Sequence, residues 1–369
     1  MQAIDWSTAQ RVGELLAGSP AAAGAGIGGE SLQSLADSFA RSVSDYALLA
    51  LPPELPPLET VDRPAWIAAN LKTMQPVLEP LMQQAGGLAP RRRRRSFSSR
   101  GQDLAPLYDA LNAAGGLLLG AQVGAMAGML SQRVLGQYDL ALLDSSVHPR
   151  LLLVAPNLAQ AARTMQVDRE QLVAWVTIHE LTHAIQFSGA PWLRAHLGGL
   201  LRELIEGLQV NVSLGSLLRL PDARDVRTLA ERVRRGEVLR LTLGEERWQL
   251  VARMQATMSL IEGHAEHVMD AVGAEVLPAL PRLRAAMTRR RETRGLPWRV
   301  LERLLGLELK LRQYEEGRRF CDAVVAAGDR GGEPGVDGRR LLARAWRSPA
   351  DLPDAAELAA PERWIARVA

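Results

Sequence analysis

Two histidines and a glutamate lie within five consecutive residues, His179-Glu180-Leu181-Thr182-His183, and this short run constrains the chain more than any other feature. Because an α-helix has 3.6 residues per turn, side chains four apart lie on one helix face, one above the other. Both imidazoles could therefore bind a single metal ion. The spacing is the H-E-x-x-H pattern of zinc sites, so we predict that His179 and His183 bind zinc.

The flanking residues predict a well-formed helix around this run. Asp168 is a good N-cap, and Gln171 three residues later completes a capping box. Gly189 and Pro191 are stop signals, so we expect a helix from about Arg169 to Phe187. The chain has only six histidines. Two of them at this spacing on a capped helix favour a metal site over a chance match on a core helix with one buried, hydrogen-bonded histidine.

A short apolar run, Leu151 to Ala155, ends at Pro156 and is typical of a strand. In zinc peptidases, a strand beside the metal helix often pairs with an extended substrate. Hydrophobic residues make up 47% of the chain but aromatic residues only 4%, so Leu, Ala and Val must fill the interior, as in helical packing. We therefore expect a mainly α fold with a small strand element beside the H-E-x-x-H helix.

A catalytic zinc site needs a third protein ligand and an open position. The metzincin extension would place glycine at 186 and histidine at 189, but Gln186 and Gly189 stand there, which excludes that family. Glu203 lies twenty residues after His183, a spacing seen in thermolysin-like enzymes. Its surroundings, however, are typical of an ordinary amphipathic helix with solvated acids.

The segment Met258–Asp270 offers a stronger third ligand. It predicts a second helix with Glu262, Glu266 and Asp270 on one stripe. A ligating Glu262 followed one turn later by Glu266 resembles the gluzincin arrangement, in which the second acid orients a ligand histidine. Gly263, which has no side chain, would let this helix approach the H-E-x-x-H helix closely. We predict that Glu262 completes the zinc site and that Glu266 supports it.

Four separated segments carry a resemblance to a known family. They are Leu130–Asp139, Val176–Arg194, Met258–Asp270 and Leu307–Phe320. On these segments the chain resembles the zincin-like metallopeptidases, zinc hydrolases often described as associated with deazaflavin coenzyme biosynthesis. The resemblance implies a largely helical zincin-like fold, with a helical N-terminal domain (residues 1–140) and a zincin-like catalytic domain (residues 141–369). It implies little about the substrate.

The predicted ligands suggest a mechanism. Zinc held by His179, His183 and Glu262 would lower the pKa of a bound water, and Glu180 would act as the general base. The expected reaction is hydrolysis of an amide in a peptide or a small molecule. His264 and Tyr314 are candidate oxyanion donors, although a surface histidine and a packing tyrosine would fit these positions equally well.

Two other functions remain open. The chain could be a binding protein that keeps a zincin scaffold without catalysis, or a metal hydrolase acting on a small metabolite. The intact Glu180 favours catalysis, because a structural zinc site needs no general base. The net charge of +3 is small for 369 residues and gives no case for a nucleic-acid partner. The oligomeric state stays open.

Cysteine usage and the N-terminus favour a cytoplasmic protein. Cys321 is the single cysteine, so no intramolecular disulfide is possible, and its apolar neighbours predict a buried structural thiol. The first nineteen residues lack the basic start and continuous apolar stretch of a signal peptide. The run Arg91 to Arg95 predicts a solvated loop, with binding of phosphate or anionic lipid as the weaker alternative.

The stretch Ala113 to Leu130 is almost wholly apolar and is near the minimum length for a membrane span. Its glycines recur every four residues, at positions 116, 120, 124 and 128. Such a stripe allows close helix packing either in a membrane or in a protein core. Gln122 in the middle and the family resemblance favour a buried helix, so we expect no membrane partner.

Overall fold

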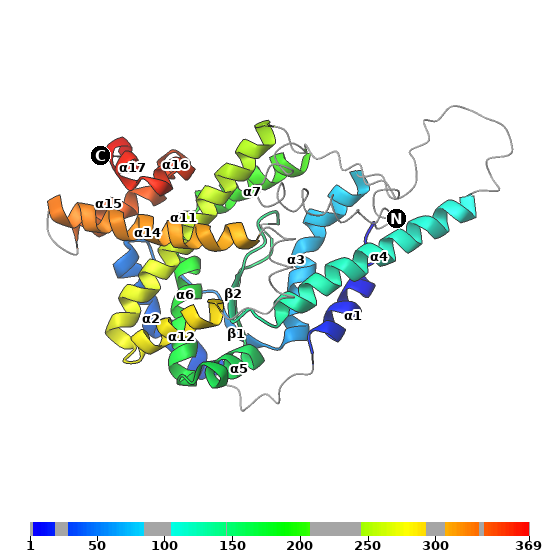
Figure 1. Cartoon of the computed structure of the whole chain (residues 1–369), viewed down its shortest axis with the longest axis horizontal. Coiled ribbons are helices and arrows are strands. Elements are labelled where there is room, and N and C mark those ends of the chain that lie inside the picture. Colours follow the sequence, from blue (N-terminus) through cyan, green and yellow to red (C-terminus); the bar gives the residue numbers. More distant parts are fainter. Residues whose placement is uncertain are drawn as a thin grey trace. The chain divides into compact units, whose positions relative to one another are not determined.

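The computed structural model describes residues 3–18, 29–84, 105–144, 146–206, 245–292, 307–331 and 336–368. It is mainly helical, with one small three-stranded sheet (Figure 1). This confirms the mainly α fold class with a small strand element. The Arg91 to Arg95 run lies outside the described residues.

The elements follow one another along the chain, and their labels are those of Figure 1. The first half contains α1 (Trp6–Leu16), α2 (Gly29–Ala47), β1 (Leu58–Val61), α3 (Arg63–Gln84), α4 (Ala105–Ser131), β2 (Gly136–Asp139), β3 (Arg150–Val154) and α5 (Ala155–Met165). The long helices of the second half are α6 (Arg169–Gly189), α7 (Trp192–Glu206), α11 (Glu245–Val276), α12 (Leu280–Glu292) and α14 (Leu307–Gly331). Short elements complete it: α15 (Asp337–Ala343), η2 (Arg344–Trp346), η3 (Pro349–Asp351), α16 (Ala355–Ala359) and α17 (Pro361–Val368).

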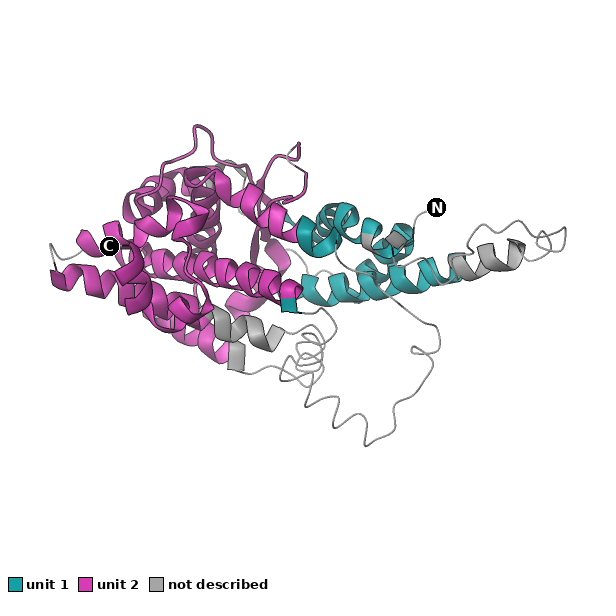
Figure 2. Cartoon of the chain, turned by 90° about the horizontal axis from the view of Figure 1, so that it is seen from above, with its two compact units in different colours: residues 1–21, 61–134, 202–245 teal, residues 22–60, 135–201, 246–369 magenta. Residues whose placement is uncertain are grey.

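The chain forms two compact units that alternate along the sequence (Figure 2). Unit 1 comprises residues 1–21, 61–134 and 202–245. Unit 2 comprises residues 22–60, 135–201 and 246–369. This partition differs from the two consecutive domains, 1–140 and 141–369, expected from the sequence. The physical reason is that α2 packs against α6, which places an early segment in the later unit.

In unit 1, the glycine stripe of α4 lies against α1. A Cβ atom at Gly124 would come within 2.1 Å of the Ala9 carbonyl oxygen, and one at Gly120 within 2.3 Å of the Asp5 carbonyl oxygen. Real Cβ atoms do not approach so closely, so only glycine permits this helix contact. The expectation that the stripe packs against protein is confirmed.

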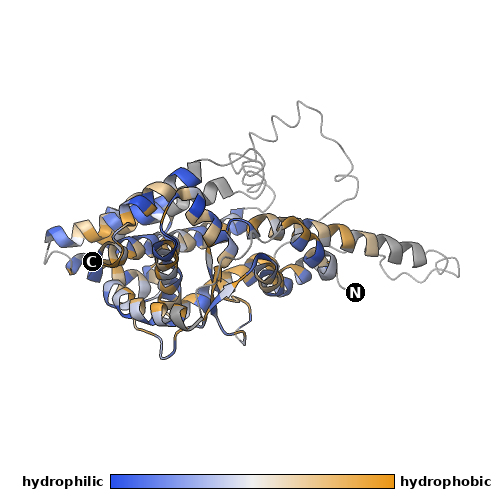
Figure 3. Cartoon of the chain, turned by 90° about the horizontal axis from the view of Figure 1, so that it is seen from below, coloured by the Kyte–Doolittle hydropathy of each residue, from blue (hydrophilic) through white to orange (hydrophobic). Residues whose placement is uncertain are grey.

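Much of α4 is coloured orange in Figure 3, because apolar residues make up most of its described part. Leu117 and Leu118 are 47% and 51% exposed. Among the described residues, one helical segment, Ala113–Ser131, is long and apolar enough by composition to cross a membrane, and 33% of its most apolar stretch is buried. One such segment is weak evidence for a span, so the absence of a membrane partner stays a prediction.

Unit 2 is built around α6, which is buried on nearly all sides. The predicted N-cap is confirmed, because the Asp168 side chain accepts a hydrogen bond from the Gln171 N–H. The helix ends at Gly189, two residues beyond the predicted end. Ile178, Leu181 and Ile185 are fully buried in the core.

Apolar packing dominates the energetics of α6. Burying one Leu or Ile side chain contributes roughly 1.5–3 kcal/mol, whereas a typical hydrogen bond adds a net of about 1 kcal/mol. The fully buried Ile178, Leu181 and Ile185 therefore hold the helix in place more strongly than any single polar contact does.

The sheet has the strand order β1-β3-β2. β2 and β3 are antiparallel, with Gly136 opposite Leu153 and Tyr138 opposite Leu151. β3 spans Arg150–Val154, so the predicted strand at 151–155 is confirmed to within one residue. β2 packs against α6, which places one edge of the sheet beside the metal-motif helix.

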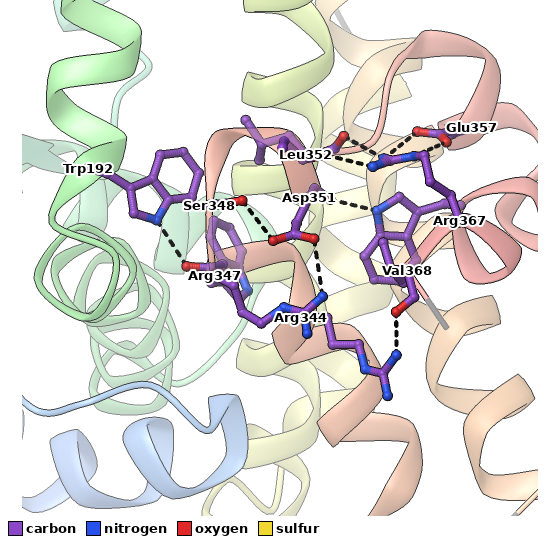
Figure 4. A network of polar contacts seen from close by, with 12 residues as sticks. Trp192, Arg344, Arg347, Ser348, Asp351, Leu352, Glu357, Arg367 and Val368 are labelled. Carbon is purple, nitrogen blue, oxygen red and sulfur yellow. Dashed lines mark hydrogen bonds and ion pairs between the residues drawn. The ribbon is translucent and has the colours of Figure 1, made fainter.

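The C-terminal segment of unit 2 is held by a polar network (Figure 4). Arg367 binds the Glu357 carboxylate through two nitrogens, at 2.6 and 2.8 Å, and donates to the Leu352 carbonyl. The Trp192 indole N–H on α7 donates to the Trp346 carbonyl at 3.1 Å. The Trp192 bond joins η2 to α7, and the Arg367 bonds join α17 to α16 and to the backbone after η3.

Candidate metal centre

Two helices, α6 and α11, bring together three side chains that could bind one metal ion. The Nε2 atoms of His179 and His183 are 3.2 Å apart. The Glu262 Oε2 atom lies 3.6 Å from each of them. Within the described ranges, these three form the group of His, Cys, Asp and Glu side chains close enough to hold one metal ion.

The three separations fit zinc. Tetrahedral zinc with bonds of about 2.0–2.1 Å has its ligand atoms about 3.3 Å apart, and the observed separations of 3.2 and 3.6 Å bracket that value. The donor set of two imidazoles and one carboxylate is also one that zinc prefers. The side chains of His179 and Glu262 are each 22% exposed, so the cluster can be reached from solvent.

The protonation of the cluster reflects burial and mutual attraction. Burial alone would raise the pKa of Glu262, but the adjacent His183 and His179 outweigh it and hold that pKa well below its usual range. Burial alone would lower the pKa of His183, but the Glu262 carboxylate reverses the shift and raises it to about 9. The group is therefore a tightly coupled cation–anion cluster that a divalent cation can join after displacing protons.

Glu180, the predicted general base, is buried beside the cluster. Burial raises the pKa of its carboxyl, and the two histidines and a hydrogen bond from the Tyr138 N–H on β2 oppose that shift. A side chain at Gly136 would collide with it, since a Cβ there would lie 2.8 Å from Glu180 Oε1 and 2.6 Å from Val176 Cγ1. Strand β2 therefore fixes the place of this carboxylate.

Gln186 is the supporting residue that sequence reasoning missed. Its side-chain Oε1 lies 2.9 Å from His183 Nδ1, and its Nε2 lies 2.9 Å from both the Ile261 carbonyl oxygen and His264 Nδ1. From the sequence alone, Gln186 indicated only that the chain lacks the glycine of the metzincin motif. A signal was present, because a residue three positions after a ligand histidine lies on the same helix face.

The other predicted site residues have mixed outcomes. Glu203 is exposed near the end of α7 and is not part of the three-residue metal group. Glu266 is buried and lines a small cavity with Trp175 and Asp270, and its predicted support of a ligand histidine stays a prediction. Tyr314 lies on α14, but its side chain is outside the described part of the chain.

His264, the other candidate oxyanion donor, is 2% exposed. Its Nδ1 is hydrogen-bonded to Gln186, and its ring packs edge-on against Trp346 with the ring centres 4.9 Å apart. Burial lowers the pKa of this imidazole to about 3, so it is neutral at ordinary pH. These contacts are those of a buried core residue, and a role as oxyanion donor stays a prediction.

The expected role of Gly263 requires a correction. A Cβ at Gly263 would lie 2.1 Å from the Gly317 carbonyl carbon, and one at Gly317 would lie 1.8 Å from the Ser259 carbonyl oxygen. The close approach that Gly263 permits is therefore between α11 and α14, not between α11 and the H-E-x-x-H helix. Glu262 reaches the histidines by the length of its own side chain.

Asp270, the last acid of the predicted stripe, belongs to an ion-pair cluster. Its Oδ1 lies 2.6 Å from Arg284 Nε, and its Oδ2 lies 2.8 Å from Arg318 Nη2. This carboxylate connects α11 with α12 and α14. Its contacts are those of a residue that stabilises the packing of three helices.

A second cavity borders the metal helix on the side of β2. It has a volume of about 290 Å³. Its lining residues include Tyr138, Ala184, Phe187 and Arg194. Ala184 directly follows His183, and Tyr138 provides the N–H that binds Glu180. The cavity is therefore lined by neighbours of His183 and Glu180, and not by these two residues themselves.

The fold and the site together define a class of protein. It is mainly helical and carries a His-His-Glu cluster that could hold a metal ion. The chain belongs to the zincin-like metallopeptidase family, whose sequence profile matches residues 4–365. A crystal structure from Chloroflexus aurantiacus, described as a candidate hydrolase with a novel fold, is 29% identical in sequence, with a TM-score of 0.63. The match covers 99% of this chain and 98% of that one. No functionally curated protein matches the chain.

Proposed function

We propose that this protein is a zinc-dependent hydrolase that cleaves an amide bond, with peptides as the first substrates to test. The observation that carries the proposal is the separation of the three candidate ligand atoms, 3.2 to 3.6 Å, beside a buried glutamate. Family membership supports a metallopeptidase, and the similar structure from Chloroflexus aurantiacus supports a hydrolase.

Each residue has a defined role in this proposal. His179, His183 and Glu262 would hold the zinc ion, which when bound polarises the substrate carbonyl and acidifies water. The Glu180 carboxylate would take a proton from the attacking water and return it to the leaving amine. Its burial raises its pKa, which makes it a stronger base than an exposed glutamate. The Tyr138 N–H would hold it in place for both transfers.

The cavity beside α6 gives the proposal a place for one substrate group. Tyr138 and Phe187 line it with aromatic surface, and their ring centres are 5.7 Å apart. Apolar lining with few polar groups favours an apolar substrate side chain. We therefore expect cleavage next to apolar residues in a peptide library.

Two measurements test the proposal. Elemental analysis of the purified protein should find about one zinc per chain. A peptide-library assay should then show cleavage by the wild-type protein and a loss of roughly 100-fold or more in Glu180→Gln, because an amide cannot accept the proton. Glu180→Gln should keep its zinc.

The exposed Glu203 supplies the matched control. Glu203→Gln makes the same chemical change outside the metal group and should leave cleavage unchanged. Purified wild-type protein that contains no zinc by elemental analysis would contradict the proposed metal site. Wild-type rates in Glu180→Gln would contradict the general base.

A further inference from the structure

Gln186 is fully buried on α6, one turn after His183, and each polar atom of its amide has a partner. Three hydrogen-bond contacts of 2.9 Å join it to His183 Nδ1, to the Ile261 carbonyl oxygen and to His264 Nδ1. A buried amide with every group satisfied is strongly oriented, because breaking any one bond leaves a buried polar atom without a partner.

The backbone carbonyl of Ile261 settles which way the amide points. A carbonyl oxygen can only accept, so the Gln186 nitrogen must face it and the Gln186 oxygen must face His183. That oxygen can only accept as well, so His183 must donate from Nδ1. The proton of a neutral His183 is thereby held on Nδ1, and the lone pair stays on Nε2, the atom that faces His179 and Glu262.

The same amide joins the two helices that carry the ligands. Ile261 directly precedes Glu262 on α11, so the bond from Gln186 to its carbonyl lies next to the third candidate ligand. The second hydrogen of the nitrogen binds His264 Nδ1, and Trp346 packs edge-on against that imidazole. Trp346 is in turn held by the Trp192 indole through its carbonyl (Figure 4).

We propose that Gln186 is a positioning residue of the metal centre, which fixes the Nδ1–H tautomer of His183 and ties α6 to α11 beside Glu262. This inference rests on the proposed zinc site. It assigns to a neutral amide the outer-shell role that the sequence suggested for Glu266. A metal-binding histidine whose second nitrogen is fixed by a hydrogen bond loses less freedom when the metal binds, which raises affinity.

Zinc affinity, measured by competition with a chelator, tests the proposal without any substrate. Gln186→Leu removes all three hydrogen bonds and should weaken zinc binding by about 10–100-fold. In its protonated form, Gln186→Glu keeps an acceptor for His183 and a donor for the Ile261 carbonyl, so it should recover most of the affinity and also serves if the leucine variant folds poorly. Nitrogen-15 NMR of the zinc-loaded protein should show the His183 proton on Nδ1 in the wild type and in Gln186→Glu.

Thr182 provides the matched control on the same helix. It is fully buried, and its hydroxyl donates a hydrogen bond to the Ile178 carbonyl at 2.8 Å, on its own helix. Thr182→Val should change zinc affinity by no more than about twofold. Wild-type affinity in both Gln186 variants would overturn the positioning role alone. A wild-type protein that binds no zinc would overturn the proposed function and this inference with it.

Discussion

Two of the helix pairs in this protein are held together by different means. In unit 1, α4 meets α1 through glycines, so that backbone lies against backbone and a Cβ at Gly124 would collide with the Ala9 carbonyl. In unit 2, α6 meets α11 through long polar side chains, with Gln186 bound to the Ile261 carbonyl and Glu262 beside the two histidines.

The two kinds of contact differ in how strongly they determine which helix is the partner. A glycine stripe indicates that another helix can pack closely against it. It does not indicate which helix, because the backbone of any helix fits against glycines. A polar contact needs a donor for each acceptor, so the chemistry of one partner restricts the other. We therefore expect the glycine contact to respond to side-chain volume and the polar contact to respond to side-chain chemistry.

The largest effect should come from removing the third ligand. Glu262→Ala takes away one of three candidate zinc ligands and should weaken zinc binding by more than about 100-fold, beyond what an outer-shell loss produces. Glu203→Ala should leave affinity unchanged. Chelator competition measures both. Zinc lost in Glu203→Ala but kept in Glu262→Ala would reverse the assignment and make the site thermolysin-like.

The second-largest effect should come from a steric change beside Glu180 in unit 2. Gly136→Ala places a methyl group against Glu180 and Val176. Misplacing a catalytic group by about 1 Å can cost about 100-fold, so we expect cleavage to fall by about 10 to 100-fold with zinc content unchanged. Steady-state rates and elemental analysis of the same sample check this. Unchanged rates would show that β2 does not fix the general base.

On the glycine side, Gly124→Leu should lower the free energy of unfolding by about 1–3 kcal/mol, because the new side chain forces α1 away from α4. The exposed Gln122→Leu adds a leucine to the same helix and should shift stability by less than about 0.5 kcal/mol. Urea unfolding measures both variants. Equal stabilities would mean that volume does not decide this contact.

The smallest effect should come from a glycine that touches nothing. A Cβ at Gly199 on α7 meets no atom within 4 Å. Gly199→Ala should therefore raise the free energy of unfolding by up to about 1 kcal/mol through helix propensity alone. The same unfolding assay applies. A loss of stability would indicate a constraint on Gly199 that the described contacts do not contain.

Local signals in the sequence predicted the local parts of the site. The cap at Asp168 and the motif itself located α6 to within two residues, and the acids of 258–270 pointed to Glu262 before its position was known. What failed depended on contacts between distant segments. The partner of Gly263 proved to be α14, because an exposed backbone patch carries no information about what covers it.

The two compact units differ from the predicted domain bounds for the same reason, since the contact between α2 and α6 joins residues far apart in the chain. The role of Gln186 was also hidden. Its helix position placed it near His183, but its two other partners lie on α11, and no local pattern relates them.

The alternation of the two units along the chain sets an order on how the metal centre can form. During synthesis, His179 and His183 leave the ribosome well before Glu262, by on the order of ten seconds at rates of ~5–20 residues per second. The core that surrounds them still lacks Trp346 and Trp364, which are buried in it and follow Glu262 in the chain. A nascent chain that has not yet reached Glu262 therefore offers only two of the three candidate ligands in an unfinished core, so the proposed zinc site would gain its third ligand only after that core has begun to form.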